Sequence, residues 1–366
     1  MPINVFSFFS GVGFLDLGFE NAGFNIIFVN ENNKKFLSSY QYNRRNNANA
    51  PMYGYSSNDV RSFLSDQIWN DTFHDYNAYR NNEIIGFIGG PPCPDFSVAG
   101  NNEGENGVNG QLTSVYVELI VRRQPAFFVL ENVKGLYQTK KHKEFYDRMK
   151  RKLYRNGYSL FDSIENALEY GVPQNRDRLI LIGLNRRVFG DRIKYTIGRH
   201  KTYNMYNVQQ MQWPGVSPFA ENNHLEKPQN IIEELTVQYW FNRNNVLNHP
   251  NSNDVFLIKN IEKYSSIAEG DTTGKSFKRL HRWRYSPTAA YGNNEVHLHP
   301  YLRRRISVAE ALAIQSLPQN FALPEDLSLS DKFKMVGNGV PYLLSLAVAR
   351  DLYEWLDDYL IGREDL

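Results

Sequence analysis

The 366-residue chain contains one cysteine, Cys93, which excludes an intramolecular disulfide and a zinc site built from clustered cysteines. No apolar stretch approaches the roughly 20 residues that a membrane-spanning helix needs. The start, Met1-Pro2-Ile3-Asn4, lacks the basic and apolar segments of a secretion signal. We therefore expect a soluble cytoplasmic protein without a metal site, and the length favours two domains.

Charge is unevenly distributed along the chain, although the formal net charge is only +2. Residues 186–305 hold 18 Lys and Arg against 10 Asp and Glu, whereas the rest of the chain holds 23 against 29. A basic middle within an acidic frame favours a polyanionic partner such as nucleic acid for one part of the protein. An uneven but merely solvated surface is the alternative interpretation.

Residues 1–185 alternate between short apolar runs and helical patterns. This alternation predicts an α/β fold with a doubly wound, mostly parallel sheet. The expected strands are residues 5–9, 26–29, 84–88, 126–130 and 179–184, and the expected helices are residues 14–22, 115–123 and 143–156.

The pattern becomes irregular after Arg186, with scattered aromatic, Asn and basic residues, so we expect a second domain there. Helical periodicity returns over residues 308–317 and 341–360. The Gly- and Asn-rich stretch 101–110 predicts a loop.

Cys93 follows the apolar run 84–88 through a Gly-Gly-Pro-Pro corner. Such a corner places the thiol at the carboxyl edge of a strand, where open α/β sheets bind ligands. A thiol with a lowered pKa can act there as a nucleophile. The alternative is a small buried hydrophobic residue without chemistry.

Ser10-Gly11-Val12-Gly13 lies between a predicted strand and a predicted helix, where backbone and helix amino end can meet a cofactor. Phe14 stands where a third glycine often lies, which disfavours a dinucleotide pyrophosphate site. Glu31 ends the second strand, a position from which a carboxylate commonly binds ribose hydroxyls. An ordinary exposed acid is the alternative for Glu31.

Glu131 ends the apolar run 126–130, so partial burial could raise its pKa toward proton transfer. A helix-capping role is the alternative. Arg176 and Arg178 alternate before the strand 179–184 and could jointly meet an anionic or carbonyl group. Surface ion pairing is the alternative for these arginines.

Taken together and in this order, the motifs resemble those of the cytosine-5 DNA methyltransferases, particularly the compact bacterial restriction–modification type. The resemblance covers almost the whole chain and thins only between about Arg186 and Lys278. The motifs that carry it are Phe9-Ser10-Gly11-Val12-Gly13, Glu31, Gly90-Pro91-Pro92-Cys93, Glu131-Asn132-Val133, Gln174-Asn175-Arg176-Asp177-Arg178, Arg304-Arg305-Ile306-Ser307-Val308-Ala309-Glu310, Gln315-Ser316-Leu317-Pro318 and Gly337-Asn338-Gly339-Val340-Pro341.

The resemblance implies a covalent mechanism on a cytosine flipped out of the duplex. Cys93 would attack carbon 6, and Glu131 would hydrogen-bond or protonate ring nitrogen 3. Arg178, with Arg176 beside it, would hold the base carbonyl. Carbon 5 would then take the methyl group of S-adenosylmethionine.

The resemblance also implies binding residues. The expected cofactor contacts are Phe9, Ser10, Gly11, Gly13, Glu31, Asp59, Val60, Leu112, Asn338 and Val340. The expected DNA contacts are Ser97, Arg192, Lys194, Arg199 and Lys201. This sequence departs from the family pattern at Ser7, Phe14 and Pro94.

The resemblance further implies a Rossmann-like catalytic and cofactor-binding domain over 1–185. A smaller irregular target-recognition domain would span 186–300, and a C-terminal segment, 301–366, would return to the first domain. Double-stranded DNA would be the substrate of a monomer, in a bacterial cytoplasm and associated with the nucleoid through DNA. A cognate restriction endonuclease would act independently.

Three alternative functions fit the sequence less well. A tRNA cytosine-5 methyltransferase would usually carry Cys-Phe-Thr, which this sequence lacks. A catalytically silent DNA-binding relative is disfavoured by intact Cys93, Glu131 and Arg178. A Rossmann oxidoreductase is disfavoured by the missing third glycine. Methyl transfer to DNA is the function that the sequence favours. The amino-acid sequence does not reveal which DNA sequence is recognised.

Overall fold

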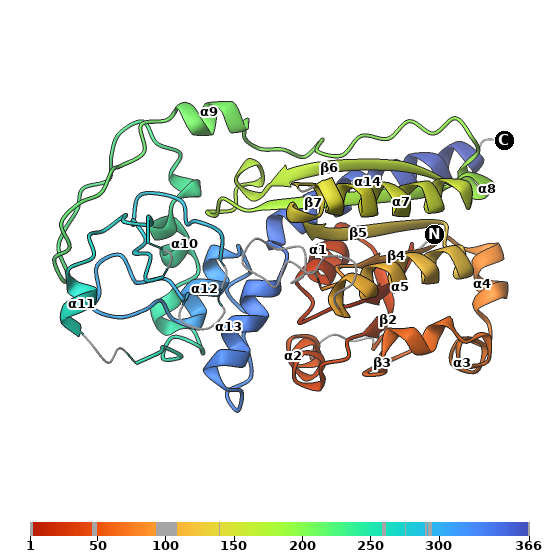
Figure 1. The fold of residues 1–366 in the computed structure, drawn as a ribbon, viewed down its shortest axis with the longest axis horizontal. Coiled ribbons are helices and arrows are strands. Elements are labelled where there is room, and N and C mark those ends of the chain that lie inside the picture. The colour runs from red at the N-terminus through yellow and green to blue at the C-terminus, as the bar shows by residue number, and fades with distance from the viewer. Residues whose placement is uncertain are drawn as a thin grey trace.

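The computed structural model describes residues 3–45, 50–92, 108–138, 140–257, 261–274, 276–289, 291 and 295–364 (Figure 1). The predicted nucleophile Cys93 and the predicted DNA contact Ser97 lie outside the described residues, as does Pro94. Within the described part, the chain forms a sheet flanked by helices and a second, irregular lobe.

The sheet has seven strands in the order β3-β2-β1-β4-β5-β7-β6. The pairs among β3, β2, β1, β4 and β5 are parallel, and β7 runs antiparallel to both β5 and β6. The predicted mostly parallel, doubly wound sheet is confirmed. The strand bounds are β1 Asn4–Phe8, β2 Asn25–Asn30, β3 Tyr55–Ser56, β4 Ile85–Gly89, β5 Phe127–Val133, β6 Tyr158–Asn166 and β7 Asp177–Asn185.

Side chains alternate between the two faces of this sheet, as strand geometry requires. Val5 packs into a core with Phe19 and Val348, whereas its neighbour Phe6 packs with Trp69 and Tyr116 on the other face. Helices α1 (Phe14–Ala22) and α14 (Tyr342–Glu364) cover the first face. The second face is covered by η1 (Val60–Leu64), α3 (Asp66–Thr72), α4 (Tyr76–Asn82), α5 (Val108–Arg123), α6 (Gly135–Gln138) and α7 (Lys140–Arg155).

Most predicted elements are present, with shifted ends. Helix α1 matches its predicted span, but α5 begins at Val108, so the last residues of the predicted loop 101–110 are helical. Strand β5 continues through Val133, which places Glu131 inside a strand rather than at a helix cap. The prediction missed β6, an edge strand with a mixed polar sequence, and α2 (Lys34–Arg44), whose sequence is largely polar.

The second lobe lies beyond the carboxyl ends of β1, β4 and β5 (Figure 1). Its hydrophobic cluster joins Trp240 and Leu280 to Leu312 and Phe333, and it also takes in Phe14 of α1. No strand occurs among the described residues of 186–300, although isolated bridges do. The helices from this point on are α8 Arg186–Phe189, α9 Met205–Gln210, η5 Glu233–Leu235, α10 Val237–Arg243, η6 Val246–Asn248, α11 Ile261–Ser265, α12 Val308–Ile314 and α13 Leu329–Asn338.

Helix α14 runs back along the sheet and packs closely on α1 (Figure 1). A Cβ atom on Gly18 would lie 2.2 Å from Ser345 Oγ, so the helix contact requires glycine there. The Ser345 hydroxyl donates to the Leu15 carbonyl oxygen at 2.7 Å. Helices α12 and α13 instead share the cluster of the second lobe. The predicted domain boundaries stay a prediction.

No helix in the described part of the chain is both long and apolar enough to cross a membrane.

Candidate active site

A cleft with a volume of about 1840 Å³ opens at the carboxyl ends of the parallel strands, between the sheet and the second lobe. Most of the predicted cofactor and catalytic residues line this cleft. The predicted cofactor residues among its lining are Phe9, Ser10, Gly11, Glu31, Asp59, Val60, Leu112, Asn338 and Val340, and the predicted catalytic residues are Glu131, Arg176 and Arg178.

The turn after β1 brings the backbone to the cleft in left-handed conformations, with φ of 53° at Phe9, 58° at Gly11 and 83° at Gly13. A Cβ atom on Gly11 would meet nothing within 4 Å, so this glycine faces open space. Gly13 does not line the cleft. Its Cβ would lie 2.6 Å from Tyr40 and from the Arg44 guanidinium, which makes Gly13 a packing glycine behind the turn.

Glu31 closes this turn from the end of β2. Its carboxylate accepts hydrogen bonds from the Gly11 amide at 2.9 Å and the Asn33 amide at 2.8 Å. Burial raises the pKa of Glu31, and the two amide donors act in the opposite direction. A carboxylate held beside an open glycine turn is suited to ribose hydroxyls.

Further cofactor-set residues lie around the same side of the cleft. Asp59 caps η1 by accepting from the Arg61 amide at 2.9 Å, and it also pairs with the Arg61 guanidinium at 2.9 Å. Val60 is buried beside it. Asn338 is the last residue of α13, and Val340 follows the helix. The cleft is therefore lined by residues from both ends of the chain.

A buried ion pair lies at the base of the cleft. Arg178 Nε is 2.8 Å from Glu131 Oε1, and the side chains are only 8% and 10% exposed, respectively. The antiparallel pairing of β5 with β7 sets Val133 opposite Arg178, which brings the pair together. A Cβ on Gly90 would come within 2.7 Å of Glu131 Oε2, so the chain leading to Cys93 passes directly beside this carboxylate.

Burial raises the pKa of Glu131, and the positive charges of Arg178 and Arg176 act against that rise. A raised pKa favours the protonated acid, which can donate to a ring nitrogen. The arrangement therefore provides a carboxyl group that can hold or transfer a proton within the cleft.

Arg176 lines the same cleft as Arg178 but makes different contacts, and the joint role expected of the two arginines stays a prediction. Its guanidinium donates to the carbonyl oxygens of Ala289 at 2.8 Å, Gly337 at 2.7 Å and Gly339 at 3.0 Å. Gln174 reinforces this junction by accepting from the Ala289 amide at 3.0 Å. Arg176 thus ties β7 to two segments of the second lobe.

A buried network that no sequence motif indicates lies behind the cofactor turn. Tyr40 donates to Asp16 at 2.9 Å, and Arg44 donates to the Gly13 carbonyl oxygen at 2.9 Å. Burial raises the pKa of Asp16 from 3.8 to about 6, with Arg44 opposing the rise. The polar and charged residues on α2 gave no local signal of this contact, because their partners lie on another helix.

None of the four basic residues predicted to contact DNA between Arg192 and Lys201 lines the cleft. Lys201 pairs with Glu165 at 2.9 Å and with Glu169 at 3.2 Å, and Arg199 lies 3.6 Å from Glu354. The structure therefore gives Lys201 and Arg199 partners on the catalytic side, and the DNA contact of all four residues stays a prediction.

Residues 3–354 match the family of C-5 cytosine-specific DNA methylases. The chain belongs to this family. It is a DNA (cytosine-5-)-methyltransferase, and S-adenosylmethionine is its methyl donor. The open glycine turn and the Glu31 carboxylate fit such a ligand, because they offer backbone space and an acceptor for ribose hydroxyls.

Relatives cover almost the full length of this methyltransferase. The Type II methyltransferase M.NmeDI of Neisseria meningitidis serogroup C is 50% identical over 97% of this chain and 84% of its own length. The Type II methyltransferase M.FnuDI of Fusobacterium nucleatum is 29% identical over 97% and 96%.

Solved structures show the shared fold. A prophage-encoded E. coli protein described as a DNA modification methyltransferase superposes with a TM-score of 0.65 at 22% identity, covering 97% of this chain and 99% of its own. The S. pombe Dnmt2 methyltransferase gives 0.61 at 13% identity, covering 98% and 99%.

Proposed function

We propose that this methyltransferase is the protecting enzyme of a Type II restriction–modification system and methylates one cytosine within a specific duplex sequence. Its 50% identity to M.NmeDI, a Type II methyltransferase, supports this assignment. A cognate endonuclease would act independently on the same sequence. The enzyme would work as a monomer on the nucleoid in the bacterial cytoplasm.

The observation that carries the residue roles is the buried Glu131–Arg178 pair beside Gly90, which leads to Cys93. Cys93 would add its thiolate to carbon 6 of the flipped cytosine, forming a carbon–sulfur bond. Glu131 would donate to ring nitrogen 3 and so accept part of the developing negative charge. Arg178 would hold both Glu131 and the base carbonyl.

Bound S-adenosylmethionine supplies an electrophilic methyl group to carbon 5. The chain's residues would orient this group: Glu31 through the ribose hydroxyls, Phe9 and Val60 around the adenine, and Asp59 at its edge. After transfer, loss of the carbon 5 proton to a base and cleavage of the carbon–sulfur bond would release Cys93. Arg176 would position the Gly337–Gly339 segment rather than touch the base.

We also propose the division into a catalytic domain (1–185), a target-recognition domain (186–300) and a C-terminal segment (301–366). Expression in a methylation-free bacterial host, followed by bisulfite sequencing of its DNA, tests the function. The expected result is one short sequence motif whose cytosine resists conversion. DNA without such a motif, from cells that contain soluble protein, would contradict the proposal.

A further inference from the structure

Helix α7 carries positive charge that lies outside the cleft. Its residues, Lys140–Arg155, include eight Lys and Arg but only two acidic residues, and both acids lie in its first half. Met149 and Leu153 pack into the core on the second face of the sheet. Arg151 and Arg155 are exposed, one helical turn apart on the same side of the helix. The second half of α7 therefore presents a basic side to solvent.

Helix α8 brings a third exposed arginine next to the end of α7. Arg186 donates to the Tyr154 carbonyl oxygen at 2.7 Å, and its guanidinium lies 4.5 Å from the centroid of the Tyr154 ring. Arg187, the next residue, is exposed. We term Arg151, Arg155 and Arg187 the far-end arginines.

The far-end arginines lie at the end of the sheet opposite the cleft. Strand β7 runs antiparallel to β5, with Arg178 opposite Val133 at the cleft and Leu184 opposite Phe127 at the other end. The extended strand β7 spans about 30 Å, and α8 follows it directly (Figure 1). A duplex bound in the cleft therefore leaves the far-end arginines accessible to another ligand.

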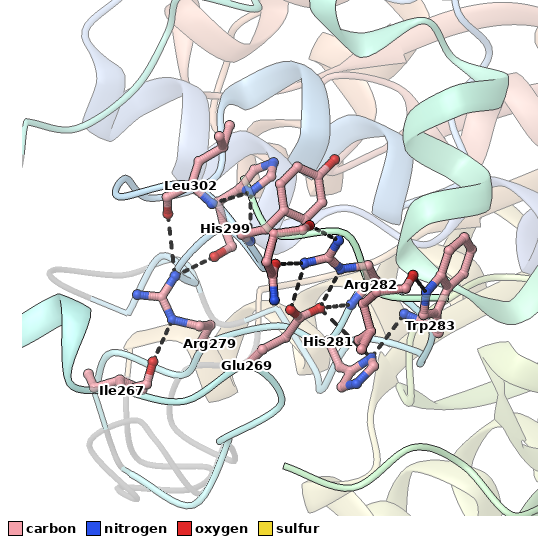
Figure 2. A network of polar contacts seen from close by, with 11 residues as sticks. Ile267, Glu269, Arg279, His281, Arg282, Trp283, His299 and Leu302 are labelled. Atoms are coloured by element: carbon pink, nitrogen blue, oxygen red, sulfur yellow. Dashed lines mark hydrogen bonds and ion pairs between the residues drawn. The ribbon is translucent and has the colours of Figure 1, made fainter. Parts of the chain in front are cut away.

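Other arginines of this protein are engaged in holding its structure. Figure 2 shows Arg279 bonded to the carbonyl oxygens of Ile267 and His299, and Arg282 bonded to the Glu269 carboxylate. Among the described residues, by contrast, none of the far-end arginines forms an ion pair with an acidic side chain. Their charges are therefore not neutralised by the protein.

A shallow cavity of about 270 Å³ lies beside two of the far-end arginines. Arg151, Arg155 and the exposed ring of Tyr154 contribute to its lining. The acidic residue in the lining, Asp162, forms an ion pair with Lys150 at 3.1 Å, so the lining keeps a net positive charge. Guanidinium groups bind phosphate oxygens through paired hydrogen bonds. This surface is therefore suited to phosphate groups.

We propose that the far-end arginines bind the phosphates of a second DNA duplex while a first duplex occupies the cleft. The inference goes beyond the proposed function, which concerns the cleft alone. DNA is the enzyme's own substrate, and a duplex carries one negative charge per roughly 1.7 Å of its axis. Phosphate contacts do not distinguish sequences, so this surface binds any duplex. An enzyme that holds two segments can pass from one to the other without full release.

The test occupies the cleft before the second duplex is added. Bisulfite sequencing of wild type first defines the cognate sequence. The enzyme is then trapped with S-adenosylmethionine on a cognate duplex that contains 5-fluorocytosine. Fluorescence anisotropy measures how tightly this trapped complex binds a labelled duplex without the cognate sequence, at several salt concentrations.

The variant for this test is Arg151→Glu/Arg155→Glu. Arg45→Glu/Arg350→Glu is the matched control, because it makes the same change in charge at two exposed arginines that line neither the cleft nor the shallow cavity. If charge reversal prevents folding, Arg151→Gln/Arg155→Gln takes its place.

We expect the trapped wild type and the trapped control to bind the second duplex. The variant should bind it about tenfold more weakly or worse, and the slope of log affinity against log salt should shrink by about 2. Adduct formation on the first duplex should stay within about twofold of wild type, because the cleft is unchanged.

Three results would overturn the inference. They are a trapped wild type that does not bind the second duplex, a variant that binds it within about twofold of wild type, and a control that loses as much affinity as the variant. A trapped wild type that binds polyglutamate but no second duplex would overturn it as well.

Failure of the proposed function is a separate outcome. If wild type formed no adduct, the role of Cys93 would be wrong, and sedimentation velocity with excess duplex would count the duplexes bound per enzyme. Two duplexes on wild type and one on the variant would support the second surface. One duplex on both would overturn it.

Discussion

Arg178 and Glu131 form an ion pair of 2.8 Å at the base of the cleft, where neither side chain is more than 10% exposed. Strands β5 and β7 carry the two residues, and their antiparallel register makes the contact possible. A carboxyl group in this setting experiences two opposed influences on its pKa, burial and a fixed positive charge. Its proton affinity is therefore set by the fold rather than by its immediate sequence.

Glu131→Gln should keep the shape of this site while removing the exchangeable proton. Loss of a general acid typically lowers the rate by about 100-fold or more. We expect that loss in single-turnover methyl transfer, with S-adenosylhomocysteine affinity unchanged. A rate within about tenfold of wild type would remove Glu131 from proton transfer.

Cys93→Ser should abolish methyl transfer because a serine hydroxyl is a far weaker nucleophile than a thiolate. Binding of DNA and S-adenosylmethionine should stay within about tenfold of wild type, since neither depends on a covalent bond. Wild type should form a lasting adduct with duplexes containing 5-fluorocytosine, and the variant should not. An adduct of equal yield with the variant would assign the nucleophile to another residue.

Gly339→Ala should destabilise the protein because the new Cβ would lie 2.1 Å from the Phe14 ring. Overpacking of this kind costs about 1–3 kcal/mol. The cost should fall by about 1 kcal/mol or more in a Phe14→Ala background, where the clash is absent. Urea unfolding of wild type, the two single variants and the double variant measures the coupling between the two substitutions. Additive changes in the free energy of unfolding would rule out the contact.

Arg176→Lys should lower stability more than it lowers the chemical step. A lysine ammonium cannot reproduce the planar contacts to Ala289, Gly337 and Gly339, so we expect a loss of about 3 kcal/mol. Arg178→Lys should show the opposite balance, with a larger fall in kcat. Thermal unfolding and single-turnover rates of both variants separate a structural role from a catalytic one. If both variants lost stability and rate to the same extent, the two arginines would not have different roles.

Asp16→Asn should change how stability depends on pH. Because burial raises the pKa of Asp16 from 3.8 to about 6, the folded protein keeps a proton that the unfolded chain releases in that window. The stabilisation is therefore complete below pH 3.8 and is lost as pH rises through about 6. The free energy of unfolding of wild type, relative to the variant, should fall by about 3 kcal/mol across the window.

Asp71→Asn, at an exposed position of α3, is the control for this series. Urea unfolding at closely spaced pH values gives the two difference curves. A flat difference for Asp16→Asn would mean that Asp16 ionises alike in the folded and unfolded states.

Local sequence was informative wherever a pattern depends on neighbouring residues. The span of α1 follows from its glycine boundaries and apolar spacing, and the buried strands follow from their apolar runs. Edge strand β6 was not predicted, because one of its faces is only partly buried and its sequence therefore does not alternate clearly between apolar and polar residues. The contacts of Arg176 could not be predicted either, since its three acceptors are carbonyl oxygens from distant segments.

The sequence by itself determined the family, the parallel α/β core and the set of residues around the cleft, because motifs and apolar periodicity are local properties. Only the tertiary structure decided which of those residues act together. Glu131 meets Arg178 through strand register, Gly13 packs against Tyr40 rather than facing the cleft, and Arg176 binds distant carbonyl oxygens. Such contacts join segments far apart along the chain, so they depend on packing and burial, which no local pattern records.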